Sequence, residues 1–158
     1  MLKIALDFHG LQEKPGYQNN KTILDMAKKL KIEYKADSVP WCGLFMAYVA
    51  SEAEKDYPNW PLAALNWKGF GMYDDAAPEL GDVLVFKRDG GGHVGLYIAE
   101  DATCYHVLGG NQDNMVSIKR IEKLRLFRAR RPIYAIGKPK SVKKYIVNST
   151  AVPSRNEA

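Results

Sequence analysis

The sequence predicts an α+β fold in which helices come first and an antiparallel β-sheet follows. In the first half of the chain apolar residues recur at helical spacing, and after Gly81 they alternate with a period of two in short runs divided by turn residues. A chain of 158 residues, 46% of them hydrophobic, is long enough to bury one core. We therefore expect a single domain with its helices packed on an antiparallel meander.

Three helices are expected before the sheet. A short one opens the chain around residues 2–8, and residues 21–30 form an amphipathic surface helix. The third begins near Ser38, an expected N-cap, with Pro40 inside its first turn. Residues 41–50 leave almost no polar stripe, which predicts a central helix buried on all sides.

The rest of the chain divides into a loop, a sheet and a tail. Residues 56–78 are expected to form a loop that shapes a cleft, with a short helix over 62–65. Residues 1–136 form the expected domain, and 137–158, rich in Pro, Lys, Ser and Asn, a basic and flexible tail. The expected strands lie within 82–87, 93–100, 104–110, 115–120 and 124–132.

Composition limits the possible partners and compartments. The chain has 23 Lys and Arg against 18 Asp and Glu, a net charge of +5, which favours a polyanionic partner without naming one. Two cysteines do not make a disulfide framework. The N-terminus lacks the pattern of a signal peptide, and no run approaches the ~18 apolar residues of a membrane span, so we expect no membrane span and a route other than a signal peptide for any action outside the cytoplasm.

Cys42 is the first candidate for chemistry. It lies two residues after Pro40, at the start of the predicted central helix. A thiol is nucleophilic as the thiolate, and a helix N-terminus or a nearby imidazolium lowers its pKa from about 8.5. The alternative is an inert core thiol, the common fate of a cysteine on an apolar helix.

A nucleophilic cysteine needs a base, and the chain has three histidines, His9, His93 and His106. His9 lies in the terminal helix and is expected at the surface. His93 follows three glycines and opens a predicted strand, which would place it at the rim of the sheet. A cysteine at a helix start and a histidine at a strand start form the arrangement found in papain.

The register of one hairpin selects the residue that would orient His93. With a two-residue turn after Glu100, that residue faces Thr103, and His93 lies beside Gly110 and next to Asn111. The Asn111 amide oxygen could then accept the Nδ1 proton and leave Nε2 to face the thiol.

His106 is the alternative third residue. In the expected register it faces Tyr97, about 13 Å along the strand from His93, and it points to the face opposite Asn111. A longer loop or a bulge near Gly110 could bring His106 into line instead.

Four sequence blocks occur in one order, "PWC", "GDVLVFKR", "GGHVGLYI" and "VLGGNQ", preceded by "GLQEKPGYQNN". With these blocks the chain resembles the CHAP and NlpC-type amidohydrolase/peptidase superfamily, and most of all its small phage-associated branch. The resemblance covers residues 6–132. It implies a papain-like fold that acts without a metal or other cofactor and hydrolyses amide bonds of peptidoglycan.

The resemblance also implies roles and a setting. Cys42 would be the nucleophile, His93 the base and Asn111 the orienting residue, while His106 has the spacing of the polar third residue in NlpC-type enzymes. The implied partner is bacterial peptidoglycan and not nucleic acid, and we expect a monomer that acts as amidase or endopeptidase. It would be made in the host cytoplasm and act on the wall after release or delivery.

Three other interpretations were weighed against this one. Cys42, His93, Cys104 and His106 supply the ligand types of a Cys₂His₂ zinc site, although no close-spaced pair accompanies them. A domain that binds wall or protein could keep the fold without the chemistry. A delivered cysteine-hydrolase toxin would use the same residues on another target.

Overall fold

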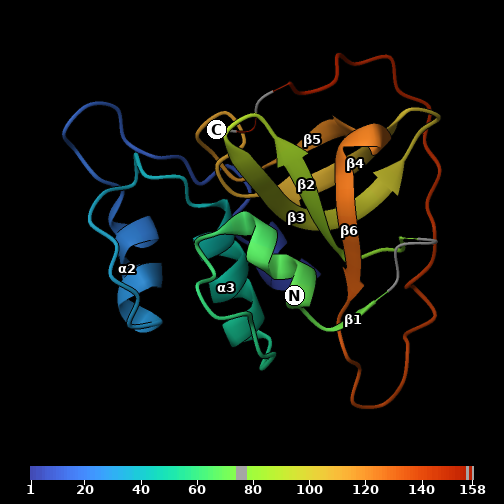
Figure 1. Cartoon of the computed structure of the whole chain (residues 1–158), viewed down its shortest axis with the longest axis horizontal. Helices are drawn as coiled ribbons and strands as arrows, with labels where there is room; N and C mark the ends of the chain where they lie inside the picture. The colour runs from blue at the N-terminus through green and yellow to red at the C-terminus, as the bar shows by residue number, and fades with distance from the viewer. Residues whose placement is uncertain (74–77, 156, 158) are drawn as a thin grey trace.

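The computed structural model describes residues 1–73, 78–155 and 157. It has an α+β architecture, with the helices on one side and the sheet on the other (Figure 1). Residues 74–77, in the expected loop, and 156 and 158, in the expected tail, lie outside the described residues. None of the helices in the described ranges is long and apolar enough to cross a membrane.

The three expected helices are present. They are α1 (Leu2–Leu6), α2 (Lys21–Lys29) and α3 (Cys42–Glu52). The Asn20 side chain caps α2 by accepting a hydrogen bond from the Thr22 N–H at 2.9 Å. The expected short helix in the loop is a 3₁₀ helix, η1 (Ala64–Gly69), a little later than predicted.

The central helix is buried as expected, but its start differs. Trp41, and not Ser38, precedes the first helical residue, so Cys42 itself opens α3. Gly43 lets the loop before η1 cross the first turn of the helix, because a Cβ at this position would lie 2.1 Å from the Pro61 carbonyl oxygen. The crossing loop and the sheet therefore enclose the start of α3.

The sheet has six strands in the order β1-β6-β2-β3-β4-β5. Strands β2 to β5 form the expected meander, whereas β6 returns to pair with β2, and β1 was not predicted. The bounds are β1 (Met72–Tyr73), β2 (Val83–Arg88), β3 (Gly91–Glu100), β4 (Cys104–Gly109), β5 (Ser117–Glu122) and β6 (Leu126–Arg131), with a 3₁₀ turn, η2 (Lys123–Arg125), before β6.

Two apolar clusters lie on the two faces of the sheet. The larger one fills the space between the helices and the sheet and includes Val85 and Val94. The smaller one joins Ile121 of β5 with Ala129 of β6, although three strands separate these two in the sheet. The sheet must therefore curl around the smaller cluster.

The expected register of the β3–β4 hairpin is wrong. Glu100 pairs with Tyr105 instead of Thr103, and His106 pairs with Ala99 instead of Tyr97. Two local features cause the difference. The Asp101 side chain holds a longer loop by accepting hydrogen bonds from the backbone N–H groups of Thr103 and Cys104, and a bulge interrupts the pairing between Tyr97 and Ala99.

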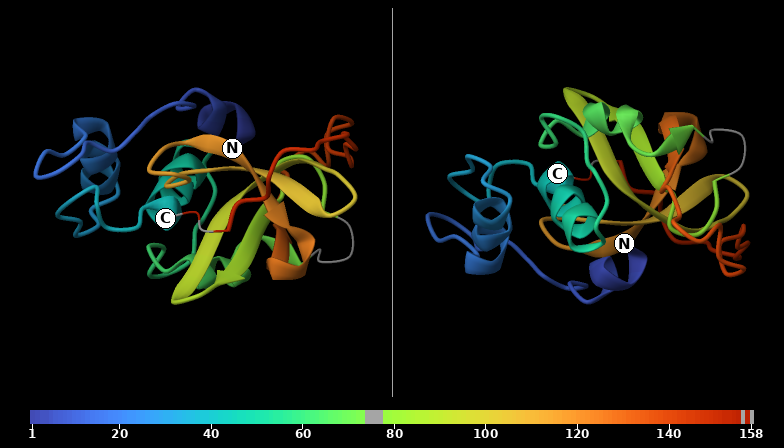
Figure 2. Two further views of the ribbon diagram at one scale, coloured as in Figure 1. Left: turned by 90° about the horizontal axis from the view of Figure 1, so that it is seen from above. Right: turned by 90° about the horizontal axis from the view of Figure 1, so that it is seen from below.

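The C-terminal segment forms no helix or regular strand in the residues described, but it is docked on the sheet by specific contacts. Ile146 makes a bridge to Glu100, and the Ser154 N–H donates to the Arg120 carbonyl at 2.7 Å. The segment, red in Figure 2, runs back across the sheet toward α3. Glu157, at its end, is almost fully buried.

Candidate functional site

Cys42 lies at the junction of α3 and β3. The backbone amides of Val94, Gly43 and Cys42 itself lie close enough to the thiol to favour its thiolate form, and Cys42 is only 4% exposed. Burial raises the pKa of the Cys42 thiol, and the three N–H groups and the positive charge of Arg88 offset this only in part. The expectation of a pKa lowered by the helix N-terminus is therefore wrong, because desolvation of the buried thiol outweighs the groups that favour the thiolate.

His93 is the third residue of β3 and directly precedes Val94, whose backbone lies against this thiol. Its neighbour Val94 contributes one of the backbone amides near the Cys42 thiol, so Cys42 lies against β3 one residue from His93. His93 pairs with Phe86 across β2 and is itself buried. Burial lowers the pKa of His93 to about 4, so the imidazole is neutral at neutral pH.

Gln112 is the hydrogen-bond partner of His93. Its Oε1 lies 3.0 Å from His93 Nε2. Its Nε2 donates to two backbone carbonyls, at 3.2 Å to Val107 and to Ser117. Carbonyl oxygens only accept, so the amide nitrogen must face them and Oε1 must face the ring.

This arrangement selects one tautomer of His93. Because Gln112 Oε1 is an acceptor, His93 Nε2 must carry the proton of the neutral ring. Nδ1 is then the unprotonated nitrogen, available as a proton acceptor. The expected assignment had these two nitrogens exchanged.

Asn111 was predicted to be the orienting partner of His93, but in the structure this partner is Gln112. Asn111 is buried beside Gln112 with a left-handed backbone, φ 57°, but the side chain that reaches His93 belongs to the next residue. The block "VLGGNQ" contains Gln112, but the expected register placed Asn111 and not Gln112 next to His93.

The two glycines of that block give the site its space. A Cβ on Gly109 would lie 3.1 Å from His93 Nε2, and a Cβ on Gly110 would lie 2.7 Å from the Trp41 ring. Small residues here let β4 pass close to both the imidazole and the start of α3.

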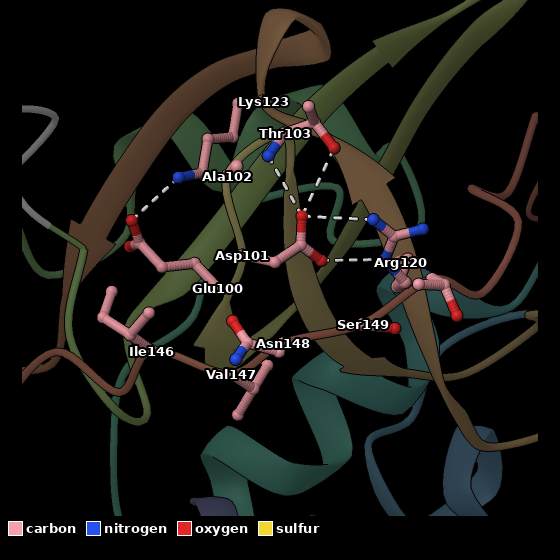
Figure 3. A pocket seen from close by; sticks show the side chains of 11 residues that line it. Glu100, Asp101, Ala102, Thr103, Arg120, Lys123, Ile146, Val147, Asn148 and Ser149 are labelled. Carbon is pink, nitrogen blue, oxygen red and sulfur yellow. Dashed lines mark hydrogen bonds and ion pairs between the residues drawn. The ribbon is translucent and has the colours of Figure 1, made fainter.

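His106 lies at the opposite end of the hairpin and does not reach His93. Its Nε2 is 2.8 Å from Asp101 Oδ2, and Arg120 binds both oxygens of the same carboxylate at 2.8 and 3.1 Å. Arg120 above all holds the pKa of Asp101 well below its usual range. Figure 3 shows Asp101 and Arg120 facing each other at a pocket of about 730 Å³.

The proposed zinc ligands are also separated. Cys104 and His106 lie near Glu100, and Cys42 and His93 lie at the start of β3, seven residues or about 23 Å away along the strand. In the ranges that the structure describes, no group of three or more His, Cys, Asp or Glu side chains is placed to hold a metal ion.

The Cys42 thiol and the His93 imidazole are both uncharged at neutral pH. Within residues 1–73, 78–155 and 157 no hydrogen bond joins the two side chains directly. Burial raises the pKa of the Tyr34 phenol, the charges of Asp37 and Glu13 raise it further, and Cys42 lies close enough to contribute as well. The Tyr34 hydroxyl donates to the Val39 carbonyl at 2.6 Å in the loop before α3.

Comparison with known proteins adds no family to this description. No protein-family model matches the chain, and a search of curated proteins found no match. The geometry of the site and the resemblance of the short sequence blocks are therefore what supports a function for this chain.

Proposed function

We propose that this chain is a cysteine-dependent hydrolase of amide bonds in peptidoglycan, with a papain-like fold. The observation that carries the proposal is the Gln112 amide, anchored on two backbone carbonyls so that its oxygen holds His93 as the Nε2–H tautomer, one residue before the Val94 backbone that lies against the Cys42 thiol. A purely structural histidine needs only a partner. A general base also needs an unprotonated ring nitrogen that can accept a proton, and in His93 this nitrogen is Nδ1.

The chemistry begins from a neutral pair. His93 Nδ1 takes the thiol proton as Cys42 Sγ forms a bond to the amide carbon, and the carbonyl oxygen becomes an oxyanion. The protonated His93 then gives that proton to the leaving amine as the C–N bond breaks, which leaves a thioester on Cys42. A water, deprotonated by His93, attacks the thioester and releases the acid and the free thiol.

Two groups are suited to the oxyanion. One is the Cys42 backbone N–H at the start of α3, and the other is the Tyr34 hydroxyl, in the loop before α3 and close enough to interact electrostatically with Cys42. For this role the Tyr34 hydroxyl must leave the Val39 carbonyl when substrate binds.

The choice of a wall substrate draws on the sequence blocks and the charge. The net charge of +5 favours an anionic polymer, and the four blocks resemble enzymes that cut wall amides. Both amidase and endopeptidase chemistry fit the same residues. Action on the wall after release or delivery belongs to the same proposal.

The proposal is tested by digesting purified peptidoglycan and identifying released fragments by mass spectrometry. Cys42→Ala should release nothing, while Cys104→Ala, which removes the second buried thiol away from the site, should release the same fragments as the original chain. Circular dichroism and thermal unfolding confirm that both variants fold. Wall binding without fragments in the original chain would favour the non-catalytic binding domain.

A further inference from the structure

The end of the chain forms an ion pair close to the candidate site. The Glu157 carboxylate accepts two hydrogen bonds from the Arg125 guanidinium, Nη1 to Oε1 at 2.8 Å and Nη2 to Oε2 at 2.6 Å. The Glu157 side chain is 0% exposed. Such a parallel two-bond geometry is specific for a planar, two-oxygen anion.

Arg125, the last residue of η2, comes one residue before the β6 position that lies in the same row of the sheet as His93. Phe86 of β2 pairs with His93 on one side and with Leu126 on the other, and Arg125 directly precedes Leu126. Two strand spacings put the backbone of Leu126 about 10 Å from that of His93. The charges of Glu157, Arg88 and Arg125 all act on His93, Glu157 raising its pKa and the arginines lowering it.

A basic pocket opens at this place. Its volume is about 380 Å³, and its lining contains four basic residues and one acidic residue: Lys87, Arg88, Asp89, Arg125 and Arg155. A second hydrogen bond, independent of Glu157, also holds the Arg125 side chain: its Nε donates to the Lys87 carbonyl at 3.3 Å. The guanidinium fork is therefore positioned by the fold and not only by Glu157.

We propose that Arg125 binds a free carboxylate of the substrate next to the Cys42 and His93 site, and that Glu157 of the same chain occupies this position when no substrate is bound. The substrate class is then an amide that carries a carboxylate near the bond to be cut. Identifying the ligand as a substrate rests on the proposed function, but the binding of a carboxylate by Arg125 does not require turnover.

Two alkylating reagents of nearly the same shape provide the test. Iodoacetate carries a carboxylate and iodoacetamide is neutral, and mass spectrometry of the peptide that contains Cys42 gives the rate for each. The measured quantity is the ratio of the iodoacetate rate to the iodoacetamide rate. Taking a ratio removes any change in thiol reactivity that a variant causes.

Glu157→Gln should raise this ratio at least about threefold, because it frees the Arg125 fork for the reagent. Adding Arg125→Lys should remove most of the rise, although the net charge is unchanged, because lysine cannot make the paired hydrogen bonds. The matched control is Glu33→Gln, which makes the same charge change at a well exposed pair with Lys35 and should leave the ratio as it was.

A second readout avoids the thiol. In Glu157→Gln, acetate should shift the His93 imidazole signals in NMR saturably, and in Glu157→Gln/Arg125→Lys this saturable shift should be lost. An unchanged ratio in Glu157→Gln, a rise that survives Arg125→Lys, or equal acetate shifts in both variants would each overturn the proposal. Neither readout uses peptidoglycan, so failure of the wall assay and failure of the carboxylate site are separate results.

Discussion

The β3–β4 hairpin has one histidine near each end, in opposite environments. His106 binds a carboxylate that is saturated by Arg120 and by two backbone N–H groups. His93 is neutral, has Gln112 as its hydrogen-bond partner, and keeps Nδ1 unprotonated. A charged residue whose partners are all satisfied holds a loop together, whereas a neutral base beside a thiol has capacity left for chemistry.

The sharpest test of this contrast replaces each histidine in turn. We expect His93→Ala to lower the turnover of peptidoglycan at least about 1,000-fold, because it removes the general base. We expect His106→Ala to change turnover less than about threefold. Fragment release on one wall preparation, with unfolding curves for both variants, gives the comparison; a larger loss in His106→Ala would reverse the assignment.

The neutral state of His93 also predicts how stability depends on pH. The unfolded chain takes up a proton at this histidine near pH 6.5 and the folded chain only near pH 4, so the unfolded state binds more protons between these values. The free energy of unfolding should therefore fall by up to about 3 kcal/mol as the pH drops from 6.5 to 4. Urea unfolding across this range measures it.

The control for this pH effect is His93→Gln, which can still donate to Gln112 but does not titrate. Its unfolding free energy should fall less than that of the original chain over the same range. Equal slopes in the two proteins would mean that His93 is not held neutral by burial.

The third residue can be tested by two neighbouring substitutions. Gln112→Ala should lower turnover about 30-fold, because the His93 tautomer is no longer held while nucleophile and base remain. Asn111→Ala should lower it less than about threefold, since Asn111 does not reach the imidazole. Steady-state rates for both variants decide between them, and the opposite ranking would restore Asn111 as the orienting residue.

The smallest expected effect concerns the other end of the hairpin. Asp101→Asn keeps the shape of the side chain but removes the charge that Arg120 and His106 face. We expect the free energy of unfolding to fall by about 1.5 kcal/mol, with unchanged turnover per folded molecule. Denaturant unfolding and fragment release from the same sample measure both, and a loss of turnover without a loss of stability would link this end to the chemistry.

Local signals made much of this fold and part of the site predictable from sequence. The expected helix after Pro40 includes Cys42, and the expected strand includes His93, although β3 begins at Gly91 and so contains two of the three glycines that were expected to precede it. The register of the hairpin was not predictable in this way, because the Asp101 loop and the bulge after Tyr97 depend on hydrogen bonds that the alternating pattern does not encode. That error moved the expected partner from Gln112 to Asn111.

Contacts between distant parts of the chain left no sequence pattern. Strand β6 pairs with β2 across the intervening meander, and Arg125 binds Glu157 across 32 residues. The composition of residues 137–158 is that of a flexible tail, yet the tail ends in a buried carboxylate. Ion pairs of Glu157 with Arg125, Lys138 with Glu79 and Lys144 with Glu100 dock it together with backbone hydrogen bonds, and composition alone does not reveal them.

The most direct test of the central claim is stoichiometric alkylation of the unaltered chain followed by the wall assay. Peptide mapping separates label on Cys42 from label on Cys104. Because the experiment uses no substituted chain, a change in the fold caused by a substitution does not arise. We predict that fragment release falls in proportion to the labelled fraction of Cys42 and reaches zero at one label per chain. Full fragment release from protein completely labelled at Cys42 would contradict a cysteine nucleophile.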